Sequence, residues 1–473
     1  MDHVLVLGAG PTGLMTALML AADGQRVTVL DRDPSPPQGG AAQLWSDWKR
    51  PGVRQFSLPH LLLPGGFRLL AAEFPAAVER LTDLGASPYN LIAGTWGVGE
   101  LGGRRPGDDR FDTLAARRPV LEAALLAEAG ATPGITIRRD TQVTGLLVGH
   151  TGGAGRPRVT GVRVLGGEQV EADLVVDAMG RRSPVSAMLA DIGAAPHEER
   201  VETGFRYYAR FFRSTDGVMP RKTPWQICHH ESVTVVPFAG DSHTWAMGIA
   251  TSGRDQELRV LGNEDVWQRA AKLYATEDRW VEGEPLTGVH VMGGTGGVYR
   301  RRFVVDELPV ATGIVAVGDA WAATNPTFGM GMTLGFKHAA LLRETLRMVG
   351  TDDPLELAVR FDAATEEHLA PLWKNLAAWD RHRLAEIDAE MRGESYTTDD
   401  PAWHQRIALE TARRKDPDVL RGSSEVGCLL ATPEEALVKA GLMGKIAKLG
   451  AGAPRYPDLG PTRLELLAAI AGN

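Results

Sequence analysis

The chain has 473 residues, of which 44% are hydrophobic and 23% are charged, close to the average for globular proteins. This composition excludes a wholly disordered, collagen-like or coiled-coil chain, and the length is too great for one ordinary hydrophobic core. The formal net charge of −8, without a long run of Lys or Arg, argues against nucleic acid and anionic membrane surfaces and favours a small-molecule partner.

Cysteine usage and the N-terminal stretch bear on the compartment. Cys228 and Cys428 are too few for a disulfide framework or a cysteine-rich zinc site, and whether they form one bridge is open at this stage. The apolar residues 4–22 are interrupted by three glycines and Pro11 and follow no basic segment, so they predict neither a signal peptide nor a membrane anchor. We expect a cytoplasmic protein without a membrane span.

The N-terminal segment predicts one βαβ unit. Residues 4–7 form a short apolar run, residues 14–22 have helical character, and residues 27–30 form a second apolar run. Helices at residues 66–84 and 118–129 are expected to follow, each ending before a glycine.

The middle of the chain is rich in strand patterns. Aromatic and polar residues alternate from residue 202 to 251, which predicts a half-buried antiparallel sheet in a second domain. Residues 159–164 and 170–176 predict a small β-meander. The remaining expected elements are strands at 135–138, 142–148 and 314–317, and helices at 333–348, 354–392 and 400–415.

Residues 8–13 read Gly-Ala-Gly-Pro-Thr-Gly and fit the G-x-G-x-x-G pattern of a dinucleotide site. Gly8 permits the tight turn, Gly10 lets the backbone approach a pyrophosphate, and Gly13 allows close helix packing, while the helix start attracts negative charge. Asp31 follows at the end of the second strand, where an acid can accept from ribose hydroxyls, so an incidental glycine turn is disfavoured. The candidate cofactor-binding residues here are Gly8, Gly10, Pro11, Thr12, Gly13, Asp31 and Arg32.

A second glycine-rich segment decides which dinucleotide is expected. Gly318-Asp319-Ala320 closes an apolar strand, and residues 325–332, Asn-Pro-Thr-Phe-Gly-Met-Gly-Met, open a helix. The segment resembles the second flavin signature of FAD-dependent monooxygenases of the p-hydroxybenzoate hydroxylase type; an ordinary turn is the alternative. The resemblance implies that Asp319 binds the ribityl or ribose end of FAD, that Pro326 packs at the isoalloxazine, and that backbone amides meet the flavin N1/O2 edge. The candidate residues here are Gly318, Asp319, Pro326, Gly329, Gly331 and Met332.

Two further stretches resemble this family. Residues 117–122, Arg-Arg-Pro-Val-Leu-Glu, resemble its Arg-x-x-Leu helix start, which implies that Arg118 lies near the FAD phosphates; the alternative is a surface arginine. Residues 177–183, Asp-Ala-Met-Gly-Arg-Arg-Ser, resemble a fingerprint seen in epoxidases, halogenases and geranylgeranyl reductases. A purely structural turn between two domains is an equally open interpretation of this stretch.

The closer resemblance is to bacterial polyether epoxidases and related natural-product monooxygenases. These proteins show an Arg-x-Gly-Val-x-Gln segment followed by histidine and a glycine-containing helix start, as at residues 50–55 and 60–66 here. Family members often carry a His-x-His pair, but Leu58 stands at its first place and only His60 remains, so we expect a packing histidine rather than a catalytic one. The resemblance covers most of residues 1–350 and, more weakly, the C-terminal region.

The other candidate residues lie on or near the predicted sheet. His229 and His230 are adjacent on a strand and point to opposite faces, so we predict no metal site. No catalytic residue is assigned. An apolar substrate cavity is a hypothesis for four aromatic residues that are as readily explained as core: Tyr207, Trp225, Trp245 and Phe328.

These patterns predict an α/β protein, α+β overall, in which a Rossmann-like FAD-binding domain carries an inserted antiparallel β-sheet substrate domain and C-terminal helices. The expected division is an FAD-binding βαβ unit (1–75), a substrate-side segment (76–110), the FAD-binding domain continued (111–190), the substrate sheet (191–300), the FAD-binding domain completed (301–350) and a helical region (351–473).

The resemblance implies a flavin-dependent monooxygenase that transfers one oxygen atom of O2 through a C4a-hydroperoxyflavin to a hydrophobic natural product. Epoxidation of an alkene and hydroxylation of an aromatic ring both stay open. Because only one G-x-G-x-x-G is present, we expect NAD(P)H to dock transiently or a partner flavin reductase to deliver electrons. The oligomeric state is open.

Three other functions compete with this prediction. A flavin-dependent halogenase is disfavoured because the chain contains no Trp-x-Trp-x-Ile-Pro motif. An FAD-dependent alkene reductase of the geranylgeranyl-reductase type is compatible with residues 177–183. A non-catalytic flavin-fold binding protein is disfavoured by the intact segment at residues 319–332, because such a protein has little need of amides directed at the isoalloxazine.

Overall fold

The computed structural model describes residues 2–149, 155–201, 204–274, 279–293, 298–453, 456 and 460–472. Its central element is a five-stranded parallel sheet with the order β20-β9-β1-β2-β5. These strands are β1 (His3–Leu7), β2 (Arg26–Leu30), β5 (Ile135–Arg138), β9 (Leu174–Asp177) and β20 (Ile314–Ala316). The apolar runs predicted from the sequence therefore form the middle of a sheet covered on both faces, as parallel sheets require.

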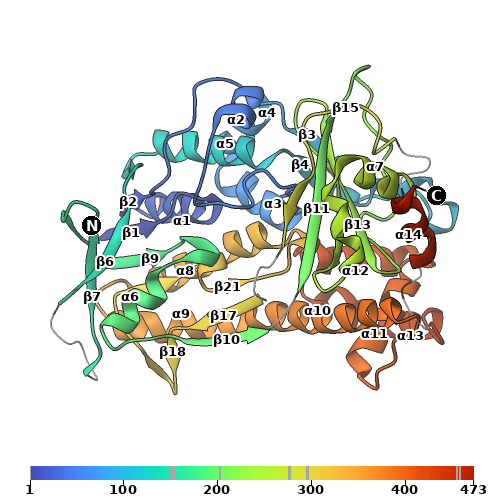
Figure 1. The fold of residues 1–473 in the computed structure, drawn as a ribbon. Coiled ribbons are helices and arrows are strands. Elements are labelled where there is room, and N and C mark those ends of the chain that lie inside the picture. The colour runs from blue at the N-terminus through green and yellow to red at the C-terminus, as the bar shows by residue number, and fades with distance from the viewer. Residues whose placement is uncertain are drawn as a thin grey trace.

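Alternate side chains of β1 enter two different cores. Val4 and Val6 pack with helices α1 (Pro11–Ala22), α5 (Arg118–Ala131) and α8 (Gly331–Val349) on one face. Leu5 and Leu7 pack on the other face, against β6 (Val143–Val148), β7 (Val159–Val164), β8 (Gln169–Glu171) and α6 (Val185–Asp191). Figure 1 shows these layers on the side of the molecule that carries the N-terminus. The two-residue period of a strand thus produces three layers.

A second, antiparallel sheet stands beside the first (Figure 1). Its path is β12-β13-β14-β11-β15, with β16 also paired to β11. The strands are β11 (Phe205–Arg213), β12 (Cys228–His230), β13 (Val233–Ala239), β14 (Thr244–Ser252), β15 (Glu284–Pro285) and β16 (His290–Met292). The sheet expected between residues 202 and 251 is present, and the predicted fold class is confirmed.

The two faces of this second sheet have different partners. Tyr208, Phe212 and Trp245 form a core with Trp267 of α7 (Glu264–Lys272) and Leu466 of α14 (Arg463–Ala471). The opposite face, called the inner face below, carries the odd-numbered residues 205–211 of β11 and their partners Ala246, Gly248 and Ala250 of β14. It is the face directed at the nucleotide-binding part of the protein.

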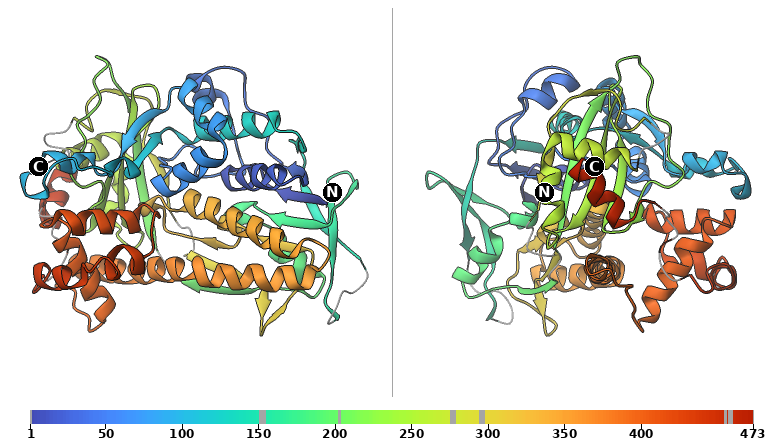
Figure 2. Two further views of the ribbon diagram at one scale, coloured as in Figure 1. Left: turned by 180° about the vertical axis from the view of Figure 1, so that it is seen from behind. Right: turned by 45° about the vertical axis from the view of Figure 1, so that its right-hand side comes forward.

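Helices α9 (Pro354–His368) and α10 (Ala370–Met391) run in line along both halves of the molecule (Figures 1 and 2). The prediction of a single helix over 354–392 is wrong, because Pro371 lacks the N–H that would continue the ladder and the helix restarts there. Residues 66–84 likewise form two helices, α3 (Pro64–Glu73) and α4 (Pro75–Asp83), separated where Pro75 starts the second.

One strand prediction also needs correction. Residues 170–176 do not form one strand of a meander: the segment is divided between β8, which pairs with β7, and β9, which joins the parallel sheet. β8 has exposed Gln169 and Glu171 and forms a hairpin with β7, whereas all four residues of β9 are buried between β1 and β20, as in other parallel sheets.

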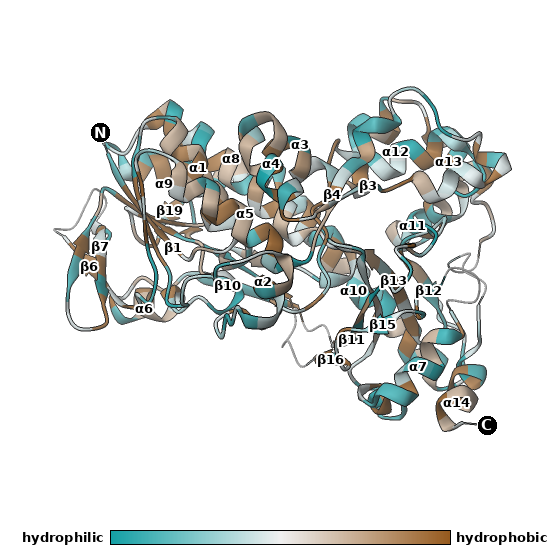
Figure 3. Cartoon of the chain, turned by 90° about the horizontal axis from the view of Figure 1, so that it is seen from above, coloured by the Kyte–Doolittle hydropathy of each residue, from teal (hydrophilic) through white to brown (hydrophobic). Residues whose placement is uncertain are grey.

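The other elements connect these layers. They are α2 (Ala41–Asp47), β3 (Ser87–Asn90), β4 (Asp112–Ala115), β10 (His197–Val201), β17 (Val298–Arg302), β18 (Val304–Val305), β19 (Leu308–Pro309), β21 (Ala322–Ala323), α11 (Pro401–Ala412), α12 (Pro417–Gly427) and α13 (Met443–Leu449). Seen from above, apolar strands lie beneath helices with polar outer faces (Figure 3).

Within the described ranges, no helix is long and apolar enough to cross a membrane. Cys228 and Cys428 are free thiols, so they form no bridge with each other.

A buried ion pair joins the two halves. The backbone N–H of Arg117, just before α5, donates to Asp241 Oδ1 at 2.7 Å, and its guanidinium donates to Oδ2 at 2.6 Å. Asp241 lies in the turn between β13 and β14 and is 0% exposed. The Arg117 guanidinium also lies 4.8 Å from the ring centre of Trp45 in α2.

We predict that Asp241→Ala lowers the free energy of unfolding by about 3–5 kcal/mol, because it leaves the Arg117 guanidinium buried and unpaired. Urea denaturation followed by far-UV circular dichroism measures the change. Glu168→Ala, which removes an exposed partner of Arg138, is the control and should change stability little. Equal effects of the two substitutions would contradict a special role for the Arg117 pair.

Candidate FAD and substrate site

Four strand ends of the parallel sheet meet at one edge. Gly8 follows β1, Asp31 follows β2, and Asp177 ends β9. Gly318 lies two residues after Ala316, the last residue of β20. Because parallel strands place all their carboxyl ends at the same edge, segments far apart in the sequence come together there. Ligands of open α/β sheets bind at this edge.

The glycines of residues 8–13 have separable physical reasons. Gly8 has φ +105°, and a Cβ atom there would lie 2.7 Å from the Ala178 carbonyl oxygen. A Cβ atom on Gly13 would lie 1.9 Å from the Gly8 carbonyl oxygen, so Gly13 is required for the turn itself. A Cβ atom on Gly10 would have no neighbour within 4 Å among the described residues. Packing explains Gly8 and Gly13 but not Gly10, which faces open space.

Thr12 brings the two glycine-rich segments into contact. A Cβ atom on Gly318 would lie 3.0 Å from Thr12 Oγ1, and one on Gly335 of α8 would lie only 2.1 Å from it. Helices α1 and α8 therefore pack closely at their N-terminal ends. A Cβ atom on Gly331 would meet only Asp319 Oδ1, at 3.7 Å, and Thr324 Oγ1, at 3.9 Å, so this glycine also has space beside it.

Both helices begin at this edge without a side-chain cap. Gly10 precedes α1 and Met330 precedes α8, and in this described part of the chain neither end has a side-chain cap or an acidic residue in its first turn. Thr333 in the first turn of α8 has a buried Oγ1 without a hydrogen-bond partner among the described residues. Free amides and a positive helix end attract phosphate or an electron-rich ring edge. These features fit FAD.

Asp31 is held by a buried charge cluster. Its Oδ2 accepts from the Ala9 N–H at 2.7 Å and from Arg50 Nη2 at 2.6 Å. Arg50 also pairs with Asp33 and with Glu122, and burial, which alone would lower the pKa of Arg50, is outweighed by Glu122 and Asp31, which raise it. Arg32, by contrast, is exposed. Arg50 thus orients the acid that the sequence analysis expects at the ribose.

Arg118 and His60 form the next part of the cluster. Arg118 Nε donates to Glu122 Oε1 at 2.6 Å, and its Nη1 lies 3.1 Å from His60 Nε2. His60 Nδ1 lies 2.9 Å from the Leu58 carbonyl, so the ring is neutral with its proton on Nδ1. Burial and the nearby Arg118 lower the pKa of His60 to about 3. His60 therefore supports Arg118, as expected of a packing histidine.

The segment after β20 is anchored by a histidine that the sequence analysis did not identify. The Gly318 N–H donates to His338 Nδ1 at 3.1 Å, and His338 Nε2 lies 3.1 Å from Thr365 Oγ1. Asp319 is partly buried, and burial raises its pKa although Arg118 and Arg181 oppose the shift. Arg118 therefore links the Glu122 cluster to Asp319 of the second glycine-rich segment.

Residues 177–183 form a tight, internally bonded turn. Asp177 Oδ1 accepts from the Met179 N–H at 3.0 Å, and its Oδ2 accepts from the Ser183 hydroxyl at 2.5 Å. Burial raises the pKa of Asp177 to about 6. The Tyr299 hydroxyl donates to the carbonyl groups of Arg181 and Asp319, tying this turn to the β20 segment. The geometry explains the motif structurally.

The four aromatic candidates do not gather in one place. Tyr207 and Phe328 pack together with Trp379 of α10 against the inner face. Trp245 is in the core on the opposite face, where its indole N–H donates to the Trp280 carbonyl at 3.0 Å. Trp225 lies beneath Arg413 and Arg414. Two of the four lie at the 325–328 turn: Phe328 is its last residue, and the Tyr207 hydroxyl donates to Asn325 Oδ1.

Several side chains at this edge escaped the sequence analysis. Arg50 begins the Arg-x-Gly-Val-x-Gln segment that the sequence indicates, but the sequence does not predict which residues pair with it. His338, Asn325 and Asp380 had no local signal beyond helical spacing or a turn pattern. Among the described residues, no group of three His, Cys, Asp or Glu side chains is placed to hold a metal ion.

Comparison with known proteins identifies the class. The FAD binding domain family matches residues 113–358, and the FAD dependent oxidoreductase family matches residues 3–89. The chain is 27% identical to protein Rv3254 of Mycobacterium tuberculosis, over 81% of this chain and 82% of the relative. It is 30% identical to rifampicin monooxygenase of Streptomyces venezuelae, over 72% of this chain and 62% of the relative. The solved structure of PqsL, a probable FAD-dependent monooxygenase of Pseudomonas aeruginosa, has a TM-score of 0.58 at 16% identity and covers 83% of this chain and 98% of its own.

The chain belongs to the FAD binding domain family, and FAD is its cofactor. Within that family it is a flavin-dependent monooxygenase, as the resemblance in residues 8–13 and 318–332 implies.

We predict that Gly10→Ala and Gly13→Ala separate ligand binding from folding. Gly10→Ala should leave the melting temperature of the apoprotein unchanged but raise the dissociation constant for FAD about tenfold or more, because the methyl group enters the pyrophosphate space. Gly13→Ala should lower the melting temperature itself, since it collides with the Gly8 carbonyl. Thermal unfolding of the apoprotein and FAD titration measure the two effects. A Gly10→Ala protein that binds FAD normally would refute the assignment.

We predict that His338 makes the apoprotein acid-sensitive. Burial lowers its pKa from 6.5 to about 3, so the unfolded chain takes up a proton first as the pH falls. The free energy of unfolding should therefore decrease below about pH 6.5, and His338 should account for about 2 kcal/mol of the decrease between pH 7 and pH 5. Urea denaturation of wild type and His338→Gln at both pH values tests this. An identical decrease in the two proteins would contradict it.

Proposed function

We propose that the protein uses FAD to transfer one oxygen atom of O2 to a hydrophobic natural product, by epoxidation of an alkene or hydroxylation of an aromatic ring. The observation that carries the proposal is the meeting of residues 8–13 with residues 318–335 through Thr12. The inner face of the second sheet stands next to this junction. When bound, reduced FAD supplies the electrons that activate O2.

The proposed FAD contacts follow the geometry of the edge. The start of α1 at Gly10 holds the pyrophosphate, Asp31 accepts from the ribose, and Asp319 binds the ribityl end. Pro326 packs against the isoalloxazine, while the free amides at Gly331 and Met332 meet its electron-rich edge. The remaining proposed contacts, from the same two turns and α5, are Gly8, Pro11, Thr12, Gly13, Arg32, Arg118, Gly318 and Gly329.

The proposed substrate space lies over the inner face. Ala209 of β11 is paired with Gly248 of β14, so these two strands carry small residues at the middle of this face, with the Phe238 ring of β13 beside Gly248. Tyr207 and Phe211 stand on either side of it on β11. An apolar, water-poor surface of this shape suits a hydrophobic substrate held against the flavin and protects the activated oxygen from water.

The electron source is external to the FAD site in this proposal. The chain contains a single G-x-G-x-x-G segment, which FAD occupies here, so we propose that NAD(P)H docks transiently or that a partner reductase supplies electrons. The names of curated relatives, among them a rifampicin monooxygenase and a 6-hydroxy-3-succinoylpyridine 3-monooxygenase, favour oxygen transfer over alkene reduction.

We predict that the purified protein retains FAD and, with a chemical or enzymatic electron source, adds one labelled atom from 18-O2 to a compound of a natural-product library. Mass spectrometry of the products measures the label. A saturated product formed without oxygen would replace the proposal by an alkene reductase, and a protein that takes up no FAD would overturn both.

A matched variant tests the location of the substrate. Gly248→Leu fills the centre of the inner face without touching the FAD contacts, so it should keep FAD affinity and lose most labelled product. Leu165→Ala, at an exposed turn beyond β7, is the control. Unchanged product formation in Gly248→Leu would place the substrate elsewhere.

A further inference from the structure

A buried chain of three side chains connects β11 of the second sheet, the 325–328 turn and α10. Asp380 of α10 accepts at Oδ1 from Asn325 Nδ2 at 2.6 Å. Asn325 Oδ1 in turn accepts from the Tyr207 hydroxyl at 2.6 Å and from the Thr327 N–H at 2.8 Å. Asp380 thus reaches, through one amide, both the turn that opens α8 and the inner face of the second sheet.

Within the part of the chain that the structure describes, Asp380 forms no ion pair. Its side chain is 0% exposed, and Oδ2 has no hydrogen-bond partner among the described residues. This contrasts with Asp31 and Glu122 at the same edge, each of which is paired with an arginine. A buried carboxylate that has only one amide donor is costly in its charged form.

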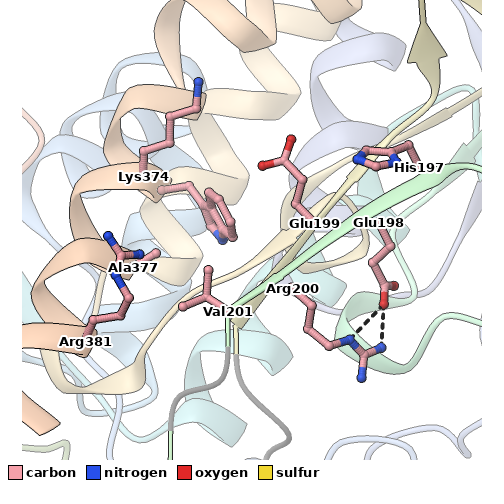
Figure 4. Close-up of a pocket in the computed structure, with 9 residues that line it drawn as sticks. His197, Glu198, Glu199, Arg200, Val201, Lys374, Ala377 and Arg381 are labelled. Carbon is pink, nitrogen blue, oxygen red and sulfur yellow. Dashed lines mark hydrogen bonds and ion pairs between the residues drawn. The ribbon is translucent and has the colours of Figure 1, made fainter. Parts of the chain in front are cut away.

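The surrounding charged groups relieve only part of this cost. Arg381, the next residue on α10, is exposed. It lines a groove of about 550 Å³. Figure 4 shows it there together with Lys374 and residues 197–201 of β10. From α11, Arg406 lies 5.6 Å from the Phe328 ring centre and pairs with Glu410.

The sheet side adds only groups that are neutral at neutral pH. Tyr207 is one, and burial raises its pKa above the ordinary value. The other is His229 of β12, whose ring lies 5.2 Å from that of Trp379, and burial lowers its pKa well below the ordinary value.

Asp380 consequently titrates in the neutral range. Burial raises its pKa to about 7, against the opposing effects of the Asn325 hydrogen bond and Arg381. Below this pH the neutral acid accepts from Asn325. Above it a negative charge stands one side chain away from Pro326 and the start of α8.

We propose that Asp380 is a positioning residue that holds the 325–328 turn and the Tyr207 hydroxyl in place through Asn325, and that its charge sets the reduction potential of FAD bound at this turn. The inference rests on the proposed function, because it takes the isoalloxazine to lie beside Pro326. A negative charge next to a flavin disfavours the uptake of electrons, so loss of the Asp380 proton lowers the potential. Reduction in turn favours retention of that proton, which couples the two events.

The test is the reduction potential of bound FAD, measured on the holoenzyme without substrate against reference dyes from pH 5.5 to pH 8.5. Asp380→Asn keeps the oxygen that accepts from Asn325 but cannot become charged. We expect its potential to equal that of wild type at pH 5.5 and to exceed it at pH 8.5. Asp380→Glu keeps a carboxyl group, so its potential should differ from that of Asp380→Asn in the same pH-dependent way as the potential of wild type does. Asp388→Asn, about two turns further along α10, is the control and should follow wild type throughout.

A second variant separates position from charge. Asp380→Leu removes the acceptor as well as the charge, so the visible circular dichroism of bound FAD should change in Asp380→Leu and stay unchanged in Asp380→Asn at pH 5.5. A difference in potential that does not vary with pH, or flavin spectra indifferent to both substitutions, would overturn the inference. If wild type takes up no FAD, the proposed function fails first; if every variant binds FAD and only the pH effect is missing, the role of Asp380 alone fails.

Discussion

The close approach of α1 and α8 at Thr12 is the constraint on which the rest of the structure depends. Gly318 and Gly335 lie so near the Thr12 hydroxyl that a side chain at either position would force the two helices apart. The two helices belong to segments separated by most of the chain, and they meet because β1, β9 and β20 are neighbours in one parallel sheet. Separation at this point would move the two free helix N-termini out of reach of a common ligand.

Charge pairing then fixes the side chains around that junction. Asp31, Glu122, Arg50 and Arg118 form one continuous buried set of ion pairs, so each charge in this set is compensated before a ligand binds. The histidines that support this region are neutral, since each ring nitrogen has a partner that matches an uncharged ring. A site built in this way is preorganised: the acid and the arginine need not reorient when the cofactor arrives. Asp380 lies outside this set of ion pairs.

Local pattern was sufficient for the parts of the fold that depend on neighbours in sequence. The βαβ unit at residues 4–30 and the glycines of residues 8–13 follow from strand length, helical spacing and the needs of a tight turn. Two pairs of helices, α3 with α4 and α9 with α10, are each predicted as one helix despite Pro75 and Pro371, because the apolar spacing continues through each proline. The division of residues 170–176 between two sheets follows from pairing: β8, Gln-Val-Glu, forms a hairpin with the neighbouring β7, whereas the apolar run of β9 is buried between β1 and β20, which lie far away in the sequence.

The candidate site was predictable to the same extent. Glycine patterns locate backbone, and they indicated where the chain must turn closely or leave room. They could not reveal His338 beneath Gly318 or Asp380 beneath Asn325, because those contacts join helices 20 and 55 residues further along the chain to the same turn. Tyr207 and Trp245 show the corresponding limit for aromatic residues: both are large residues on paired strands.

Strand parity resolves that ambiguity once the register is known. Odd-numbered residues of β11 face the junction, while Tyr208 and Phe212 share the opposite core with Trp245. The outer face fills its space with rings that lock the sheet against α7 and α14. The inner face carries small residues where Ala209 pairs with Gly248. The same strands therefore carry large rings on one side and small residues on the other, where we propose that the substrate lies. Close packing of the outer face holds these strands in a fixed position relative to the junction.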